Sequence, residues 1–339
     1  MFLNFILYSQ LHKNSFVGMI KKLMFFFMFL PGILMAQQWK KQKREIIFGI
    51  GAANFLGDLG GADGIGTYFL RDLEFSQTKP HVQAGFRYRF TPTISAKAAF
   101  SYARVAGSDR LTSEPARRNR DLEFRSDIWE VSAQFEYALI EEHIKGRYIR
   151  GKTKFPVNIY LFGGIGFLHF NPKSRINFQG DWIPLQPLGT EGQGLDGGAK
   201  KYIRYTMCIP VGIGFKYPIT NQWHIGLEYG LRKSFSDYID DVSGSYYDRG
   251  AIRDARGDQA MYFADPASYS TPYSNDRKAF DTRGVKFIDG PNGEKRDVAG
   301  YTNPGQRRGN SSKDDSYMFA TLSVSYKLIK GSTKSRVKF

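Results

Sequence analysis

The chain has 339 residues, a formal net charge of +16 and a single cysteine, Cys208. One cysteine excludes an intramolecular disulfide, and its position far from the N-terminal leader excludes the lipid-modified cysteine of a lipoprotein. Aromatic residues make up 15% of the chain and there are 36 glycines. This mixture is unusual for a soluble enzyme and is typical of short amphipathic strands joined by many turns.

The N-terminal segment has the layout of a secretory signal peptide. After Met19, Lys21 and Lys22 precede an apolar run over residues 23–34, and the small residue Ala36 marks the expected cleavage point. The run is shorter than the roughly 20 residues of a membrane helix, although an anchoring helix is the alternative. We expect residues 1–36 to be a leader that starts at Met19, and residues 37–44 to be a short periplasmic segment.

Eight later segments are predicted to be β-strands. In six of them apolar and polar residues alternate with a period of two, which puts them on opposite faces of a strand. These six are residues 81–90, 94–104, 128–139, 202–217, 223–232 and 317–328. Residues 45–56 and 157–170 are instead apolar and glycine-rich on both faces. Their glycines are expected where the fold bends or where bulky neighbours intrude.

The lengths of these strands and of their connections predict a transmembrane barrel. A tilted membrane strand needs about 9–11 residues. The shorter links, 91–93, 140–154 and 218–222, alternate with the longer links, 57–80, 105–123, 171–200 and 236–316. We predict an all-β fold: an eight-stranded antiparallel transmembrane β-barrel over residues 45–329, with short periplasmic turns, long extracellular loops and both termini in the periplasm. The alternative is a soluble sandwich or lipocalin-like barrel, which would have to cover outward aromatic residues such as Trp129 and Phe135.

Charged residues on the polar faces of the strands predict a filled lumen. Eight strands enclose a space that side chains just fill, and buried charges need partners. We therefore expect a paired plug in place of a diffusion pore; an ion path is the alternative, but no sequence feature favours it. The predicted plug residues are Arg87, Arg89, Lys97, Glu130, Glu136, Arg204 and Glu228, with Lys216 on the same faces.

The sequence does not predict catalysis, a cofactor, a metal site or a small-molecule substrate. No serine lies in a nucleophile-elbow pattern, and no two histidines have metal-ligand spacing. His224 and Glu228 share a strand face, where a lumen contact is favoured over a catalytic dyad. The acidic run at 237–248 lacks glycine and glutamate at the positions that an EF-hand loop requires. The adhesion tripeptide at 256–258 is attributed to chance in a loop rich in its three residue types.

The net charge is concentrated at one predicted end of the barrel. Without the three lysines of the leader the charge is +13, and residues 40–44, 141–154 and 327–338 carry +12 of it, all on the predicted periplasmic rim. A basic rim attracts acidic partners, so we hypothesise a protein-docking face there, with phospholipid headgroups as the alternative. Nucleic acid is a poor candidate because an exported protein rarely meets it. The candidate docking residues are Lys41, Arg44, Arg147, Arg150, Lys152, Lys330, Lys334 and Arg336, of which the last three lie in a basic tail, 330–339.

Five segments resemble one known family. They are GIGAANFLGDLGG (49–61), LFGGIGFLHFNP (161–172), LQPLGTEGQG (185–194), IPVGIGFKY (209–217) and FSDYIDDVSGSYYD (235–248). In this order they resemble the PorG-type outer-membrane barrel of the type IX secretion system of Bacteroidetes. The resemblance implies a non-catalytic scaffold that ties a periplasmic ring, formed by a PorK-like lipoprotein and a PorN-like protein, to the outer membrane; the system exports adhesins, hydrolases and gliding machinery. The alternative is a surface-binding or adhesion barrel that acts through loop 236–316.

Overall fold

The computed structural model describes residues 43–59, 75–111, 120–141, 157–266, 287–289, 295–297, 302 and 304–328. The predicted leader, most of link 140–154 and the basic tail lie outside the described residues. The eight long strands are β1 (Arg44–Leu56), β2 (Lys79–Arg89), β3 (Ile94–Ser108), β4 (Glu123–Ile140), β5 (Asn158–His169), β8 (Tyr205–Pro218), β9 (Trp223–Ser234) and β12 (Ser316–Leu328). The shorter elements are η4 (Phe75–Gln77), η5 (Asp109–Leu111), β6 (Pro172–Ser174), η6 (Ile176–Phe178), β7 (Ile183–Pro184), α3 (Arg249–Arg256), α4 (Asp258–Ala264), β10 (Phe287–Asp289) and β11 (Lys295–Asp297).

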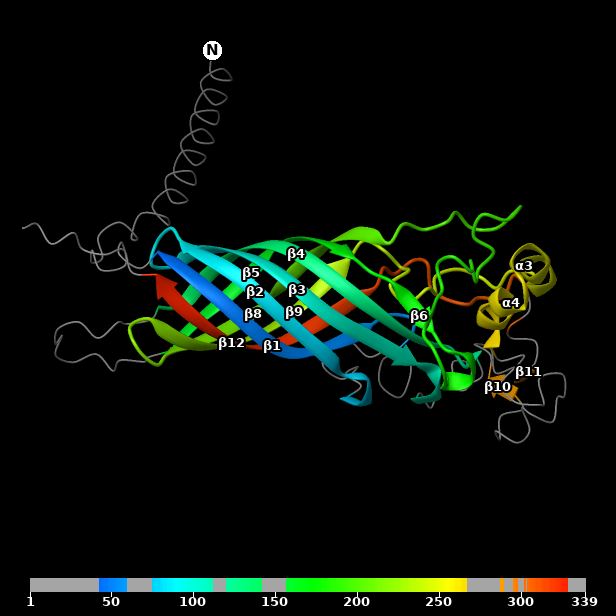
Figure 1. Ribbon diagram of the computed structural model, residues 1–339, viewed down its shortest axis with the longest axis horizontal. Coiled ribbons are helices and arrows are strands. Elements are labelled where there is room, and N and C mark those ends of the chain that lie inside the picture. The colour runs from blue at the N-terminus through cyan, green and yellow to red at the C-terminus, as the bar shows by residue number, and fades with distance from the viewer. Residues whose placement is uncertain are drawn as a thin grey trace, which may run out of the picture.

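The eight long strands form one closed antiparallel cylinder. Each pairs with the next in chain order, and β12 pairs with β1 to close the sheet (Figure 1). Closure leaves no unpaired strand edge, which is the condition for a sheet to lie in lipid. The predicted eight-stranded barrel is therefore confirmed, and the sandwich alternative is wrong.

The two ends of the barrel differ in their connections. Arg44 pairs with Leu328, so the first and last strands meet at one end, beside the tight turns at residues 90–93 and 219–222. We call this the short-turn end. Helices α3 and α4 lie at the opposite, long-loop end (Figure 1). None of the helices among the described residues is long and apolar enough to cross a bilayer.

Apolar side chains face outward along the strands and charged ones face inward. On β4, Phe135 is 68% exposed, whereas its neighbours in sequence, Gln134 and Glu136, are 2% and 3% exposed. This distribution is the reverse of that in a soluble protein. It identifies the outer face of the cylinder as a lipid-facing surface.

Three strands have bounds that differ from the prediction by three residues or more: β8, β4 and β3, which ends four residues late, at Ser108. β8 begins at Tyr205, three residues later than predicted, because Tyr202 stacks on Tyr238 at 4.5 Å and donates a hydrogen bond to Asp241 at 2.6 Å. β4 begins five residues early, at Glu123, and pairs with the end of β3. At about 3.3 Å per residue, the 18 residues of β4 exceed a hydrocarbon layer of about 30 Å even when tilted. The β3–β4 hairpin therefore extends beyond the membrane.

An apolar cluster fills the lumen near the long-loop end. Phe55 of β1 meets Phe124 of β4 at 4.8 Å between ring centroids, and Leu168 and Phe319 belong to the same buried cluster. The loop residue Ile239 packs into this cluster as well. This apolar layer was not predicted, and it accounts for the inward apolar residues at the long-loop ends of β1 and β5, such as Phe55 and Leu168.

Candidate functional site: a filled lumen and an ordered loop assembly

A network of charged side chains fills the lumen near the short-turn end. Arg87 of β2 lies at its centre, where Nε and Nη2 donate to the two carboxylate oxygens of Glu136 at 2.5 and 2.9 Å. The same guanidinium pairs with Glu45 at 3.2 Å and with Glu228 at 3.3 Å. Bidentate, charge-assisted hydrogen bonds of this kind are among the strongest in proteins. One cation thus joins carboxylates from three other strands.

Two lysines and a tyrosine complete this network. Lys97 Nζ donates to Glu228 at 2.6 Å, and Lys216 Nζ donates to Glu45 at 3.2 Å. The Tyr160 hydroxyl donates to Glu228 at 2.6 Å. The space that remains between the network and turn 90–93 measures about 10 Å³, which is no more than the room for one water. The network therefore acts as a plug.

Inward glycines make room for large groups in the lumen. A Cβ added at Gly212 or Gly230 would lie 2.5 or 2.7 Å from the ring of Phe162. A Cβ at Gly166 in β5 would lie 2.6 Å from the Sγ of Cys208. Such contacts are shorter than van der Waals packing allows, so these positions accept only glycine without displacement. At Gly166 the neighbour is the small side chain of Cys208, so a close contact is present there but not the bulky neighbour that the sequence predicted.

A second polar group separates the plug from the apolar layer. Glu130 of β4 accepts a hydrogen bond from the Tyr317 hydroxyl at 2.8 Å and lies 3.5 Å from Nε of Arg232. The Arg232 guanidinium lies 4.0 Å from the centroid of the Phe319 ring, within the range of a cation–π contact. Polar and apolar layers together fill the interior along its length.

Loops fold over the long-loop end as an ordered assembly, which we define as residues 171–204, 235–266 and 304–315. Arg308 forms an ion pair with Glu191 at 3.1 Å, and both side chains are 1% exposed. Glu191 also accepts from the N–H of Ser243 at 2.9 Å, and Asp241 accepts from the Thr190 hydroxyl at 2.6 Å. Buried pairs with this many hydrogen bonds hold three separate segments together.

Buried carboxylates in the loop assembly bind backbone amides. Asp240 accepts from the N–H of Leu59 at 2.9 Å, and Asp315 accepts from the N–H of Ile239 at 2.9 Å. Burial, followed by repulsion from neighbouring carboxylates, raises the pKa of both groups well above the usual value. Burial likewise raises the pKa of Asp237 to about 7. In the described part of the chain, no group of three or more His, Cys, Asp or Glu residues could hold a metal ion.

The remaining sequence motifs have structural contacts. Arg256 of the adhesion tripeptide donates to the carbonyl oxygens of Leu188 and Gly189 at 3.0 and 3.2 Å, and to that of Gln193. Its guanidinium is therefore engaged within the loop assembly. His224 contacts the carbonyl oxygen of Gln222 at 3.2 Å, while Glu228 is held by the plug.

The structure brings together most of the predicted plug residues. The buried, inward-facing ones are Arg87, Arg89, Lys97, Glu130, Glu136, Lys216 and Glu228. The prediction that Arg204 belongs to the plug is wrong. Arg204 precedes β8 and donates a hydrogen bond to the side chain of Asn171 at 3.0 Å, at the long-loop end. Its position follows from Tyr202, which is held in the loops by its hydrogen bond to Asp241 and so keeps residues 202–204 out of strand β8. Sequence reasoning missed Glu45 and Tyr160, although Glu45 shares the parity of the inward glycine Gly49 on β1.

Of the predicted docking residues on the basic rim, the structure describes one, Arg44. Arg44 is exposed at the short-turn end of β1. The others lie outside the described residues: Lys41, Arg147, Arg150, Lys152, Lys330, Lys334 and Arg336.

These features define the class of protein: a transmembrane β-barrel of the outer-membrane type with a filled lumen. Residues 21–181, just under half of the chain, match a family model described as a domain of unknown function, DUF6089. No curated protein matches the chain.

Solved structures that the chain is similar to are small outer-membrane barrels. Ail, the attachment invasion locus protein of Yersinia pestis, in complex with the heparin analogue sucrose octasulfate, is 10% identical, with 85% of this chain and 99% of that chain covered and a TM-score of 0.34. Neisserial surface protein A is 9% identical over 84% and 97%, with a TM-score of 0.34. OprG from Pseudomonas aeruginosa is 9% identical over 85% and 98%, with a TM-score of 0.33. At these identities and TM-scores the likeness carries no inference about function.

Proposed function

We propose that the chain is a structural component of a type IX secretion system, in which it anchors the periplasmic ring of a PorK-like lipoprotein and a PorN-like protein to the outer membrane. The observation that carries the proposal is the filled lumen. Paired charges, aromatic rings and an apolar layer occupy the interior, so the ends and outer face of the barrel are left for function. A non-catalytic scaffold fits this arrangement.

The contacts among the segments that resemble the PorG-type barrel support the same proposal. Leu59 donates to Asp240, and Thr190 donates to Asp241, so three of these segments bind one another in the loop assembly. Two others meet in the lumen, where Phe162 lies against Gly212. The resemblance therefore falls on residues that hold the architecture together, as expected if the architecture is shared.

The scaffold role requires the short-turn end to face the periplasm. The single native cysteine is buried, so an introduced cysteine provides one reactive thiol. In intact cells a membrane-impermeant maleimide should label Ser311→Cys, at the long-loop end, and should not label Asn221→Cys, in a short turn. The reverse pattern would exclude a periplasmic short-turn end.

Affinity purification in mild detergent, followed by mass spectrometry, tests the partner. Ring proteins should co-purify with the parent chain and should be lost after charge reversal at Arg147, Arg150, Lys334 and Arg336, because a basic rim attracts acidic surfaces. Arg253→Glu, an exposed charge reversal on α3, is the matched control and should retain them. Equal recovery from the rim variant and the control would leave the docking face without support.

A surface-binding barrel is the second candidate, and the ordered loop assembly favours it. Deleting residues 250–310 removes α4, Arg308 and all but the first residue of α3 from this assembly, and leaves the barrel strands in place. The scaffold role expects secretion to persist in this variant. The surface-binding role expects loss of function while the barrel still inserts.

A further inference from the structure

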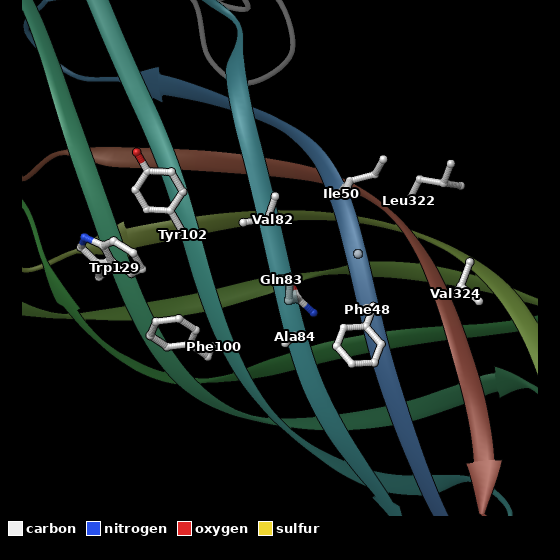
Figure 2. Close-up of a pocket in the computed structure, with 11 residues that line it drawn as sticks. Phe48, Ile50, Val82, Gln83, Ala84, Phe100, Tyr102, Trp129, Leu322 and Val324 are labelled. Carbon is white, nitrogen blue, oxygen red and sulfur yellow. The ribbon is translucent and has the colours of Figure 1, made fainter.

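The outer face of the barrel carries an apolar groove on its β1–β2–β3 side (Figure 2). Its floor is formed by Val82 and Ala84 of β2, which are small compared with their neighbours. Across the sheet Ala84 is paired with Phe48 and Phe100, and Val82 with Ile50 and Tyr102. Large side chains of β1 and β3 therefore flank the small side chains of Val82 and Ala84 on both sides. The two sides are Phe48 and Ile50 on one, and Phe100, Tyr102 and Trp129 on the other.

The groove is large and its lining is apolar. It measures about 690 Å³, and Phe48 and Ile50 on its side are 65% and 66% exposed. It lies on the lipid-facing surface of a transmembrane cylinder, where hydrocarbon chains are the surrounding medium. Toward the long-loop end, the groove is lined by Tyr102 and Trp129. Tyrosine and tryptophan are the residue types that sit at the level of lipid headgroups. An acyl chain is the occupant that this lining fits.

A cluster of cations continues the same surface toward the long-loop end. Arg104 follows Tyr102 by two residues on β3, which is about 7 Å along a strand. Arg104 Nε donates to Asp127 at 2.8 Å, and Tyr102 donates to the same carboxylate oxygen at 2.9 Å. Lys173 lies 3.7 Å from the other oxygen of Asp127. The groove and the cation cluster therefore share a residue, Tyr102.

Two more arginines belong to this cluster, and their charge is only partly balanced. Arg125 and Arg175 lie 4.2 and 4.4 Å from the ring centroid of Trp182. Arg175 also pairs with Glu123 at 2.6 Å, whereas no carboxylate among the described residues forms an ion pair with Arg125. With Arg104 and Lys173 there are four cations against two carboxylates, a local excess of +2.

We propose that this surface docks the phosphorylated glycolipid of the outer leaflet, with an acyl chain in the groove and a phosphate at Arg104 and Arg125. Arginine is suited to phosphate because its planar guanidinium donates two parallel hydrogen bonds. The charge excess at the end of an apolar groove complements a lipid that carries both groups. The inference rests on the proposed orientation of the barrel, because only then does the long-loop end face the outer leaflet.

Native mass spectrometry of the purified barrel with bis-phosphorylated lipid A, monodephosphorylated lipid A and phosphatidylethanolamine tests the site. Arg104→Gln with Arg125→Gln should lower retention of bis-phosphorylated lipid A about tenfold or more, since each lost charge-assisted hydrogen bond costs about 1.5–3 kcal/mol. Ala84→Phe should lower it by filling the groove. Arg253→Gln, an exposed position on α3, and Ala133→Phe, an outward position of β4 outside the groove, are matched controls and should change nothing.

Each outcome decides one part of the proposal. Equal retention by all variants, or equal retention of phosphatidylethanolamine, would overturn the site. If Ala84→Phe lowers retention of bis-phosphorylated lipid A and the double arginine variant does not, the acyl chain in the groove is supported and the phosphate contact is overturned. Folding of each variant is checked by its heat-dependent gel mobility, and the groove and arginine variants test the site independently. The double arginine variant keeps the basic rim, so it should still co-purify with the ring proteins if the scaffold role holds. Unchanged lipid retention together with recovered ring proteins would mean that this lipid site fails while the scaffold role stands.

Discussion

Replacing Arg87 with methionine tests whether the plug stabilises the barrel. Methionine keeps most of the aliphatic stem and removes the charge and the hydrogen-bond donors. Glu136 would lose both of its hydrogen bonds, at 2.5 and 2.9 Å, and retain only Lys97 Nζ at 4.0 Å. Glu136 is 3% exposed, so water cannot readily replace the lost donors. The substitution therefore leaves a buried carboxylate without a hydrogen-bond partner.

The expected loss of stability follows from the cost of breaking a buried pair, which is about 3–5 kcal/mol. With a urea dependence of about 2 kcal/mol per M, the unfolding midpoint should fall by about 2 M. Unfolding is measured in lipid vesicles by tryptophan fluorescence and, independently, by heat-dependent gel mobility. The double variant Arg87→Met with Glu136→Gln should recover part of the loss, because it removes the orphaned charge, and the cycle yields the coupling energy.

The control for this experiment is Arg44→Met, an exposed position at the end of β1, where the change should stay within about 0.5 kcal/mol. A loss below about 1 kcal/mol for Arg87→Met would refute the reasoning. It would show that water enters the lumen and solvates Glu136, so that the plug contributes no more than exposed ion pairs do.

Three further predictions concern the loop assembly and the lumen. Because burial raises the pKa of Asp237 to about 7, the folded assembly binds a proton that the unfolded loop releases above about pH 4. Stability of the assembly should therefore fall as the pH rises from about 4 to about 7, seen as faster proteolysis of the loops at pH 8 than at pH 5. Asp237→Asn should weaken this dependence without abolishing it, because burial also raises the pKa of Asp240 and Asp315. Glu191→Gln should destabilise the assembly by about 2–4 kcal/mol, because Arg308 loses its buried counter-charge; hydrogen exchange should rise in the loops and stay unchanged in the strands. Cys208 should resist a maleimide in the folded barrel and react fully once it is unfolded, since the residue is 0% exposed; fast labelling of the folded form would contradict a filled lumen.

The strands and their faces could be predicted because their signals are local. Alternation over a single segment, such as residues 128–139, determines which side chains share a face, whatever the segment pairs with. The even number of strands and the alternation of short and long links then imply a closed barrel. In such a barrel the first strand begins and the last strand ends at the same end of the cylinder. The structure confirms all eight strands; the late start at Tyr205 results from a tyrosine stack between two loops, and the early start at Glu123 from continued pairing with the end of β3.

The pairing inside the lumen and within the loop assembly could not be predicted from the sequence. Lys97 and Glu228 are 131 positions apart, and Arg308 and Glu191 are 117 apart. Nothing in the sequence near either partner specifies the other.

The sequence by itself therefore determined the class of fold, the lipid-facing surface and the charged character of the interior. Only the tertiary structure decided that an apolar layer fills the lumen near the long-loop end, that Arg204 lies outside the plug and that polar loop segments fold into a buried assembly. The reason is physical: the face of a residue follows from the geometry of its own strand, whereas its partners depend on how the cylinder closes and brings distant segments together.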